Sequence, residues 1–261
     1  MKLAAIYNVF DGEELLAGSV QLIRPEVAFL IAIVQLKSNR GEVYEGGVHE
    51  CARLNGSGLI DIVSHFTPDL QQPARVNEAR KRQKGVQIAN QLGATHFLHL
   101  DCDEYYDPLP FRRAKTLVLE QAYEGTVCRL KTYFGACNLQ LRGFDVYHVP
   151  FIHRLLPSTN CGFCAYPFTV DPTRSVNSSQ VAEMPPEVIF MHHFSWVRRD
   201  IGRKIRNSSS DVFSESVRLA AIEDFERARA GLVVRLYQKE LIEVTLPKAV
   251  QECFKDPSGR G

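Results

Sequence analysis

The sequence predicts an α/β fold in which helices cover the faces of a mixed sheet. Short apolar runs that end in polar residues alternate with longer segments of helical periodicity through residues 1–110. Runs of this kind suit the buried strands of a parallel sheet. The 261-residue chain shows no internal repeat and no linker, so we expect one domain over residues 1–254 and a flexible tail over 255–261.

The first half is predicted to run strand, helix, strand, strand, helix, strand. Strands are expected at residues 3–7, 27–34, 59–66 and 96–100, and helices at 13–23 and 76–92. In the second helix, Glu78 and Arg82 are spaced for an ion pair one turn apart, and Gly93 follows as a C-cap. Residues 41–58 are rich in glycine and polar residues and carry no assignable pattern.

The second half, residues 111–254, has a less regular pattern. A helix is expected at 111–123, followed by strands at 125–134 and 144–155. The stretch 157–180 is rich in Cys, Gly, Pro and Ser. An apolar run at 188–191 then leads into a basic segment at 198–206, an amphipathic helix at 210–230 and a closing segment at 232–246.

Composition indicates a soluble globular protein. The formal net charge is +1, which provides no global field toward nucleic acid or an anionic membrane. No window holds 18 uninterrupted apolar residues, so we expect no transmembrane helix. Asp11, Glu13 and Glu14 interrupt the apolar N-terminal run, which is therefore interpreted as a strand and not as a signal peptide. Seven cysteines, an odd number, favour reduced thiols in a cytoplasmic protein.

Polar residues follow three of the expected strands. Because crossovers in parallel sheets are right-handed, residues 8–12, 35–39 and 101–104 are expected to converge on one edge, where α/β sheets bind ligands. Asp101 and Asp103 stand there at i and i+2, a spacing at which two carboxylates can share one divalent cation. An isolated Asp-x-Asp is more often a solvated acidic turn, so the neighbouring motifs decide between the two interpretations.

Four motifs occur in a characteristic order. They are Asn8-Val-Phe-Asp-Gly-Glu-Glu-Leu-Leu16 and Gln35-Leu-Lys-Ser-Asn39 after the first two strands, Lys81-Arg-Gln-Lys-Gly85 on a helix, and Asp101-Cys-Asp103. Together they resemble a family-2-type glycosyltransferase of the GT-A fold, with its Arg-Asn-x-Gly and Asp-x-Asp elements. Downstream, Met191 to Lys204 resembles the late histidine and basic run of such enzymes.

This resemblance implies a metal-dependent transferase that uses a nucleotide sugar, expected to be a UDP-sugar. Residues 1–110 would form the nucleotide-sugar half and 111–254 the acceptor half. Asp103 is the expected ligand of Mn²⁺ or Mg²⁺, Asp101 would contact the ribose and the metal's water shell, and His192 or His193 would complete the metal site. The expected donor-binding residues are Asn8, Val9, Asp11, Gln35, Ser38, Arg82, Asp101, Arg198, Arg203 and Lys204.

The sequence departs from the family's pattern at two places. Gln35 stands where many members carry an acid that contacts uracil, although Gln35 or Ser38 can still bond a pyrimidine edge. No clear Glu-Asp pair occurs in the second half, where inverting members place the base that an inverting reaction needs. Asp171 and Asp145 are the candidates, with Asp171 preferred because it lies in a constrained polar turn; a retaining reaction would need no such base.

Other interpretations remain open at this stage. The acceptor would be a glycan or another hydroxyl. A hydroxymethylated base in DNA is an alternative if Arg112, Arg113, Lys115, Arg203 and Arg206 form one basic face. A non-catalytic nucleotide-sugar-binding protein is a further alternative, which the acidic pair and the histidines disfavour.

Two lysines, the tryptophan and a pair of cysteines also have alternative interpretations. Lys81 and Lys84 are expected on a solvated helix face. Trp196 suits either the core or sugar stacking. Cys161 and Cys164 lack a second pair at zinc spacing, which disfavours a zinc site.

Overall fold

The computed structural model describes residues 1–209 and 214–255. The strands are β1 Leu3–Val9, β2 Phe29–Val34, β3 Ile62–His65, β4 His96–Asp101, β5 Glu104–Tyr105, β6 Gly125–Phe134, β7 Leu139–Leu141, β8 His148–Arg154, β9 Val181–Glu183, β10 Phe190–Trp196, β11 Val233–Val234 and β12 Lys239–Glu243. The α-helices are α1 Glu13–Ile23, α2 Gly46–Gly56, α3 Ala74–Gln91, α4 Pro108–Glu120, α5 Ile201–Asn207, α6 Glu215–Glu226 and α7 Lys248–Glu252, and the 3₁₀ helices are η1 Arg24–Glu26 and η2 Pro172–Arg174.

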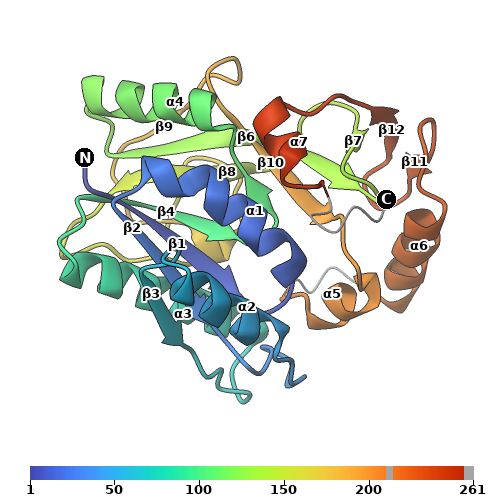
Figure 1. The fold of residues 1–261 in the computed structure, drawn as a ribbon, viewed down its shortest axis with the longest axis horizontal. Helices are drawn as coiled ribbons and strands as arrows, with labels where there is room; N and C mark the ends of the chain where they lie inside the picture. Colours follow the sequence, from blue (N-terminus) through green and yellow to red (C-terminus); the bar gives the residue numbers. More distant parts are fainter. Residues whose placement is uncertain (210–213, 256–261) are drawn as a thin grey trace.

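These strands form one mixed sheet with helices on its faces (Figure 1). Its main path runs β11-β12-β7-β6-β8-β4-β1-β2-β3. The segment β3-β2-β1-β4 is parallel, whereas β8 is antiparallel to both β4 and β6. Strand β10 runs parallel to β6 and antiparallel to β5. The prediction of a single α/β domain with a mixed, helix-flanked sheet is confirmed.

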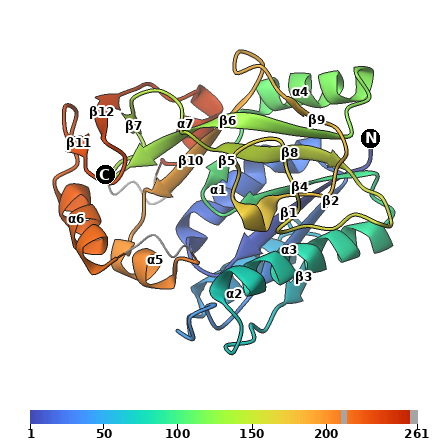
Figure 2. The same cartoon turned by 180° about the vertical axis from the view of Figure 1, so that it is seen from behind.

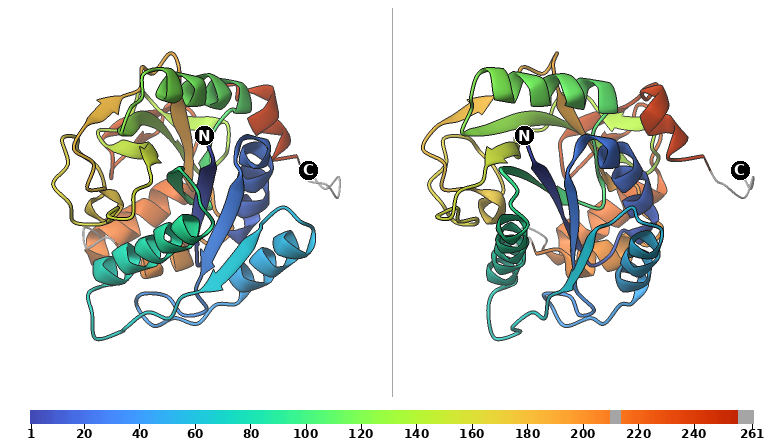
Figure 3. Two further views of the ribbon diagram at one scale, coloured as in Figure 1. Left: turned by 90° about the vertical axis from the view of Figure 1, so that its left-hand side faces the viewer. Right: turned by 60° about the vertical axis from the view of Figure 1, so that its left-hand side comes forward.

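Strand β1 lies at the centre of the parallel segment, and all seven of its residues are buried. Its side chains alternate between two cores, as strand geometry requires. Ala5 and Tyr7 pack in the core that includes residues of α1 and α2, whereas Ala4 and Ile6 pack in the core that includes residues of α3. Figure 3 shows α1 and α2 on one side of these strands and α3 on the other. An apolar strand buried on both faces is therefore the element around which the N-terminal half of the fold forms.

The last part of the chain surrounds a separate apolar cluster. Trp196 stacks on Phe134 with ring centroids 5.2 Å apart, and its indole Nε1 donates to the Tyr237 hydroxyl at 2.7 Å. Trp196 is 2% exposed. Of its two expected environments, the structure assigns Trp196 to the core, so this side chain holds the carboxyl end of β10 in place.

Most predicted elements agree with the structure in type, and several differ in extent. Helix α2 lies in the unassigned stretch 41–58, β8 covers only the second half of the strand expected at 144–155, and β10 extends well beyond the apolar run at 188–191. The start of the helix expected at 210–230 and all but residue 255 of the expected tail lie outside the described residues. Within the described part of the chain, no helix is long and apolar enough to cross a membrane.

Candidate active site

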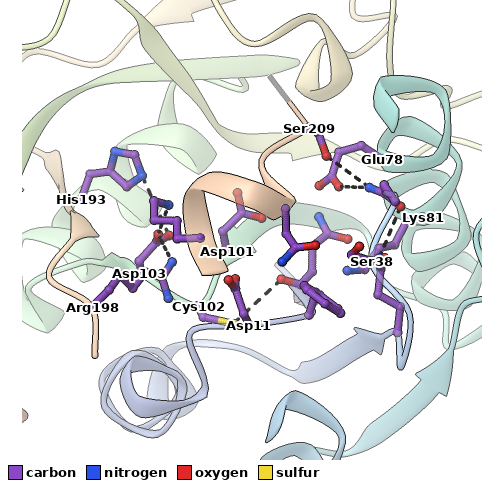
Figure 4. Close-up of a pocket in the computed structure, with 16 residues that line it drawn as sticks. Asp11, Ser38, Glu78, Lys81, Asp101, Cys102, Asp103, His193, Arg198 and Ser209 are labelled. Carbon is purple, nitrogen blue, oxygen red and sulfur yellow. Dashed lines mark hydrogen bonds and ion pairs between the residues drawn. The ribbon is translucent and has the colours of Figure 1, made fainter. Parts of the chain in front are cut away.

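A pocket of about 180 Å³ lies at the carboxyl ends of β1, β2 and β4 (Figure 4). The loops after these strands converge there, as the right-handed crossovers predicted. Helix α3, strand β10 and helix α5 supply the remaining walls. The lining residues are Asn8, Phe10, Asp11, Gln35, Ser38, Asn39, Glu78, Lys81, Asp101, Cys102, Asp103, His193, Arg198, Lys204, Asn207 and Ser209.

One end of the pocket is lined by uncharged polar groups that follow β1 and β2. Gln35 donates through Nε2 to the Lys37 carbonyl at 2.9 Å and to Asn39 Oδ1 at 3.3 Å. This orientation leaves Gln35 Oε1 buried without a hydrogen-bond partner among the described residues, and both amide atoms of Asn8 are in the same state. Buried polar groups are normally paired, so these free acceptors and donors are available to a polar ligand or to water.

Asp101 ends β4 at the middle of the pocket and is held by two arginines. Arg82 Nη2 lies 3.1 and 3.2 Å from its two carboxylate oxygens, and Arg174 Nη1 lies 3.6 Å from Oδ2. Burial alone would raise the pKa of Asp101, but the Arg82 and Arg174 guanidinium groups outweigh it and hold the pKa below its usual value. Asp101 is therefore an ionised acceptor, and its side chain is 34% exposed toward the pocket.

Asp103 forms a second ionic group at the other end. Its Oδ2 lies 2.5 Å from Arg198 Nη2 and 3.6 Å from Lys204 Nζ, and its Oδ1 lies 3.9 Å from His193 Nε2. Burial would raise the pKa of Asp103, but Arg198 and then Lys204 lower it well below its usual range. The antiparallel pairing of β5 with β10 places His193 opposite Glu104, and so beside Asp103.

Arg198 is inserted between Asp103 and the start of α1. Its side chain is 6% exposed, and its Nη1 has no hydrogen-bond partner among the described residues. A Cβ at Gly12 would lie 1.6 Å from Nη1, so only glycine leaves room for the guanidinium. Gly12 also has φ +81°, a conformation that glycine adopts without strain.

The structure brings together eight of the predicted donor-binding residues: Asn8, Asp11, Gln35, Ser38, Asp101, Arg198 and Lys204 line the pocket, and Arg82 braces Asp101 from behind. Two others lie elsewhere. The Val9 side chain is fully buried in the core, although its carbonyl accepts from Lys81 Nζ at 2.9 Å. The Arg203 guanidinium stacks 3.7 Å from the centre of the Tyr44 ring and pairs with Asp200. The donor role of the gathered residues remains a prediction.

The two candidate histidines point to opposite faces of β10. His193 lines the pocket, whereas His192 is 3% exposed and shares a 2.7 Å hydrogen bond with the Tyr133 hydroxyl. Burial lowers the pKa of His192 to about 3. Between the two alternatives left open by the sequence, the geometry therefore favours His193 as the residue available to a ligand.

The two candidate bases lie outside the pocket lining. Asp171 caps η2 and accepts from the Thr173 amide at 2.9 Å. Asp145 accepts from the Thr132 hydroxyl at 3.1 Å, and Thr132 is the neighbour of His193 across β6 and β10. Asp145 thus contacts a neighbour of His193, and Asp171 caps the short helix whose Arg174 pairs with Asp101. The arrangement does not decide which of the two could act as a base.

The sequence pattern misplaced the side chain of Lys81 and gave no indication of Arg174. Lys81, expected on a solvated face, is 2% exposed and lines the pocket, and burial lowers its pKa. Its place follows from Gly85 one turn later, where a Cβ would lie 2.2 Å from Ile6 and would push α3 off the sheet. That i, i+4 spacing was the available signal. Arg174, 6% exposed, carried no sequence signal because its pairing with Glu104 joins distant segments.

Two side chains of the pocket are spaced so that they could share a divalent cation. No group of three or more His, Cys, Asp or Glu side chains among the described residues forms a protein-only metal cage. Asp103 Oδ1 and His193 Nε2 nevertheless lie 3.9 Å apart. Two ligands bonded to one ion at about 2.1 Å can be at most about 4.2 Å apart. The pair therefore fits an ion whose other ligands are substrate oxygens and water, the usual arrangement for phosphate-bound Mg²⁺.

Comparison with known proteins gave matches to solved structures alone. No family model and no curated protein matches the sequence. S. aureus TarS is similar with TM-score 0.47 and 9% identity over 87% of this chain, which spans 43% of TarS. A TarS 1–349 complex with UDP-GlcNAc gives TM-score 0.46 and 10% identity over 87% of this chain and 72% of that one.

A third structure is glucosyl-3-phosphoglycerate synthase from Mycobacterium tuberculosis in complex with Mn²⁺, UDP and phosphoglyceric acid. It gives TM-score 0.33 and 12% identity over 52% of this chain and 45% of that one. Likenesses at these TM-scores and identities do not define an activity. The activity has to be inferred from the pocket itself.

Proposed function

We propose that this chain is a glycosyltransferase that moves a sugar from a nucleotide diphosphate sugar, a UDP-sugar, to a hydroxyl acceptor. The observation that carries the proposal is that one pocket holds the unpaired amide atoms of Asn8 and Gln35 together with the ionic group Asp103, His193 and Arg198, although Glu78 and Lys81 of α3 also lie on the Ser38 side. Figure 4 shows Ser38 on one side, Asp103, His193 and Arg198 on the other, and Asp101 between them. A nucleotide sugar has the same order of parts, because its ribose joins a neutral base to a charged diphosphate.

The uncharged end supports a pyrimidine base. Gln35 Oε1 is an acceptor for an imide N–H, and the Asn8 amide can both donate to and accept from a base edge. The neutral Gln35 thus presents the acceptor that an acid presents in the family it resembles. Asp101, ionised and partly exposed, is placed to accept from a ribose hydroxyl.

The ionic end supports departure of the diphosphate. Transfer breaks the anomeric C–O bond, and negative charge develops on the leaving oxygens. Arg198 and Lys204 line this region beside Asp103 and supply fixed positive charge where it is needed. Asp103 and His193 would hold a Mn²⁺ or Mg²⁺, which would serve as a Lewis acid on the diphosphate.

The acceptor proton requires a base if the reaction inverts the anomeric centre. We propose Asp171, because Arg174 of the same short helix η2 reaches Asp101 and so ties this turn to the donor site. Asp145 is the alternative. Asp171→Asn should lower kcat by about 10²- to 10⁴-fold with little change in donor affinity, as expected for loss of a general base. If Asp145→Asn has that effect instead, the assignment moves to Asp145.

A donor screen by thermal shift tests the proposal directly. UDP-, GDP-, ADP- and CMP-sugars are added with and without Mn²⁺. A donor at 100 times its dissociation constant should add about 2.7 kcal/mol to the free energy of unfolding. Mn²⁺-dependent donor hydrolysis and transfer by the wild type would distinguish an enzyme from a non-catalytic binding protein. Asp103→Ala should abolish both reactions. Stabilisation by none of the donors would refute the proposal, and unchanged turnover of Asp103→Ala would refute the metal role.

The geometry removes the premise of a DNA acceptor. Arg112 and Lys115 on α4 pair with Glu26 at 2.6 and 2.8 Å. Arg203 and Arg206 lie on α5, and Figures 1 and 2 place α4 and α5 far apart on the molecule. The expected basic face is therefore not formed by these residues, and a glycan or other small hydroxyl acceptor is the proposed class.

A further inference from the structure

The carboxylate of Asp103 is already neutralised by the protein's own cations. Its side chain is 4% exposed, and the guanidinium of Arg198 lies 2.5 Å from Oδ2, with Lys204 at 3.6 Å from the same oxygen. A buried carboxylate without a partner is strongly unfavourable. These ion pairs are therefore what stabilises Asp103 when no donor is present.

A divalent cation alone meets an obstacle at this carboxylate. To bind Asp103 Oδ1 and His193 Nε2 it must approach a carboxylate whose other oxygen, Oδ2, faces Arg198 and Lys204, and like charges in a poorly hydrated site repel strongly. Repulsion by the ion would weaken the contact of the buried Arg198 with Asp103 Oδ2, and Arg198 Nη1 already lacks a partner among the described residues.

A diphosphate alone meets the opposite obstacle. It would draw Arg198 and Lys204 toward its oxygens and leave Asp103 buried without a counter-ion, next to further negative charge. Neither ligand by itself can therefore use its best contacts without leaving a buried charge unpaired.

We infer that Arg198 is an internal counter-ion that exchanges Asp103 for the donor diphosphate when a divalent cation takes Asp103, so that cation and diphosphate each strengthen the binding of the other. The planar guanidinium suits this exchange because its fork matches carboxylate and phosphate oxygens alike. Gly12 leaves the space that the guanidinium occupies beside Asp103. The inference rests on the proposed function, since it requires a diphosphate ligand.

Linkage makes the effect measurable in both directions. If the cation raises the affinity for the nucleotide by a given factor, the nucleotide must raise the affinity for the cation by the same factor. We expect a factor of about 5 to 150. Isothermal titration calorimetry of UDP with and without saturating Mn²⁺, and of Mn²⁺ with and without UDP, measures it, after correction for the Mn²⁺–UDP complex formed in solution. ADP and GDP are titrated alongside, so that a different base preference is not mistaken for absence of binding.

Two variants separate the exchange from a structural role of the arginine. Asp103→Asn frees Arg198, so UDP without Mn²⁺ should bind about 5- to 150-fold more tightly than to the wild type, and Mn²⁺ should add nothing. Arg198→Gln removes the competing cation, so Mn²⁺ alone should bind more tightly while the coupling factor falls toward one. Arg199→Gln is the matched control, because Arg199 is the exposed neighbour outside the pocket lining, and it should keep the wild-type coupling.

The outcomes distinguish the two proposals. If UDP binds equally well with and without Mn²⁺, or if Arg198→Gln weakens the binding of Mn²⁺ alone, the counter-ion exchange is overturned and the proposed function stands. If no nucleoside diphosphate binds under any condition, both are overturned.

Discussion

Replacing Gly12 by alanine should displace Arg198 without touching any charged group. Two effects add at this position. Alanine at φ +81° costs about 1–2 kcal/mol, because the left-handed conformation crowds its Cβ. The new Cβ would also lie 1.6 Å from Arg198 Nη1 and 2.7 Å from its Cζ, so the guanidinium has to leave.

The second effect is the larger one. Asp103 would lose its 2.5 Å partner, and breaking one side of a buried ion pair costs about 3–5 kcal/mol. Lys204 remains 3.6 Å away and offsets part of the loss, so we expect the lower end, about 3 kcal/mol. Gly143→Ala is the matched control, because Gly143 has φ +79° and its Cβ would meet nothing within 4 Å.

Urea unfolding of the wild type and both variants measures the two effects. Gly143→Ala should lower the free energy of unfolding by about 1–2 kcal/mol, and Gly12→Ala by about 3 kcal/mol more, at similar m-values. UDP affinity should also fall in Gly12→Ala and stay unchanged in Gly143→Ala. Equal destabilisation by the two substitutions would show that Arg198 does not depend on the space at Gly12, and would refute the reasoning.

Three further predictions concern groups around the site. Arg174→Met should lower the free energy of unfolding by about 3–5 kcal/mol in urea, because it leaves the buried Glu104 carboxylate unpaired; a loss under 1 kcal/mol would contradict this. Burial lowers the pKa of His153 to about 4, so between pH 4 and 6.5 the unfolded state binds more protons than the folded state and stability falls as the pH drops. His153→Gln should reduce the change in the free energy of unfolding across this pH range by up to about 3 kcal/mol. Trp196→Phe should reduce stability by about 1–3 kcal/mol through the unpaired Tyr237 hydroxyl, yet leave donor affinity in calorimetry unchanged, whereas a sugar-stacking role would lower affinity.

Much of the fold was predictable because its elements carry local patterns. Helix α1 matches the predicted range 13–23, and β6 matches 125–134. Helix α2 was missed because only Gly47, Cys51 and Leu54 of it are buried, too few to produce a visible apolar stripe. The short strands β5 and β12 form through pairing with distant segments, and no local pattern encodes a partner that is many residues away; β11 in turn pairs with β12.

The site was predictable where it follows from topology and not where it depends on burial. The loops after β1, β2 and β4 had to converge, so Asn8, Gln35 and Asp101 could be named. The choice between His192 and His193 could not be made from the sequence, because a strand places successive side chains on opposite faces and the face toward the pocket is set by tertiary packing.

The charges around the pocket bear on the role that the proposed function gives to Asp101 and Asp103. Five carboxylates and five cationic side chains of the described residues make up this charged cluster: Asp11, Glu78, Asp101, Asp103 and Glu104, with Lys81, Arg82, Arg174, Arg198 and Lys204. The cations of this cluster are thus matched in number by acids, so no large excess of positive side chains surrounds the pocket.

The acids instead keep the cations charged and in place. Burial lowers the pKa of Lys81 and Lys204, and nearby carboxylates counteract that loss of charge. Burial acts in the same direction on Arg198, yet Asp103 and then Asp11 outweigh it and raise its pKa above the usual value. Under the proposed function, positive groups that are fixed before the donor binds would need no reorganisation when charge develops on the leaving diphosphate. Asp103 would therefore serve as the anchor that positions Arg198 before binding and as a metal ligand after it, which is why its substitution should alter nucleotide binding even without a metal ion.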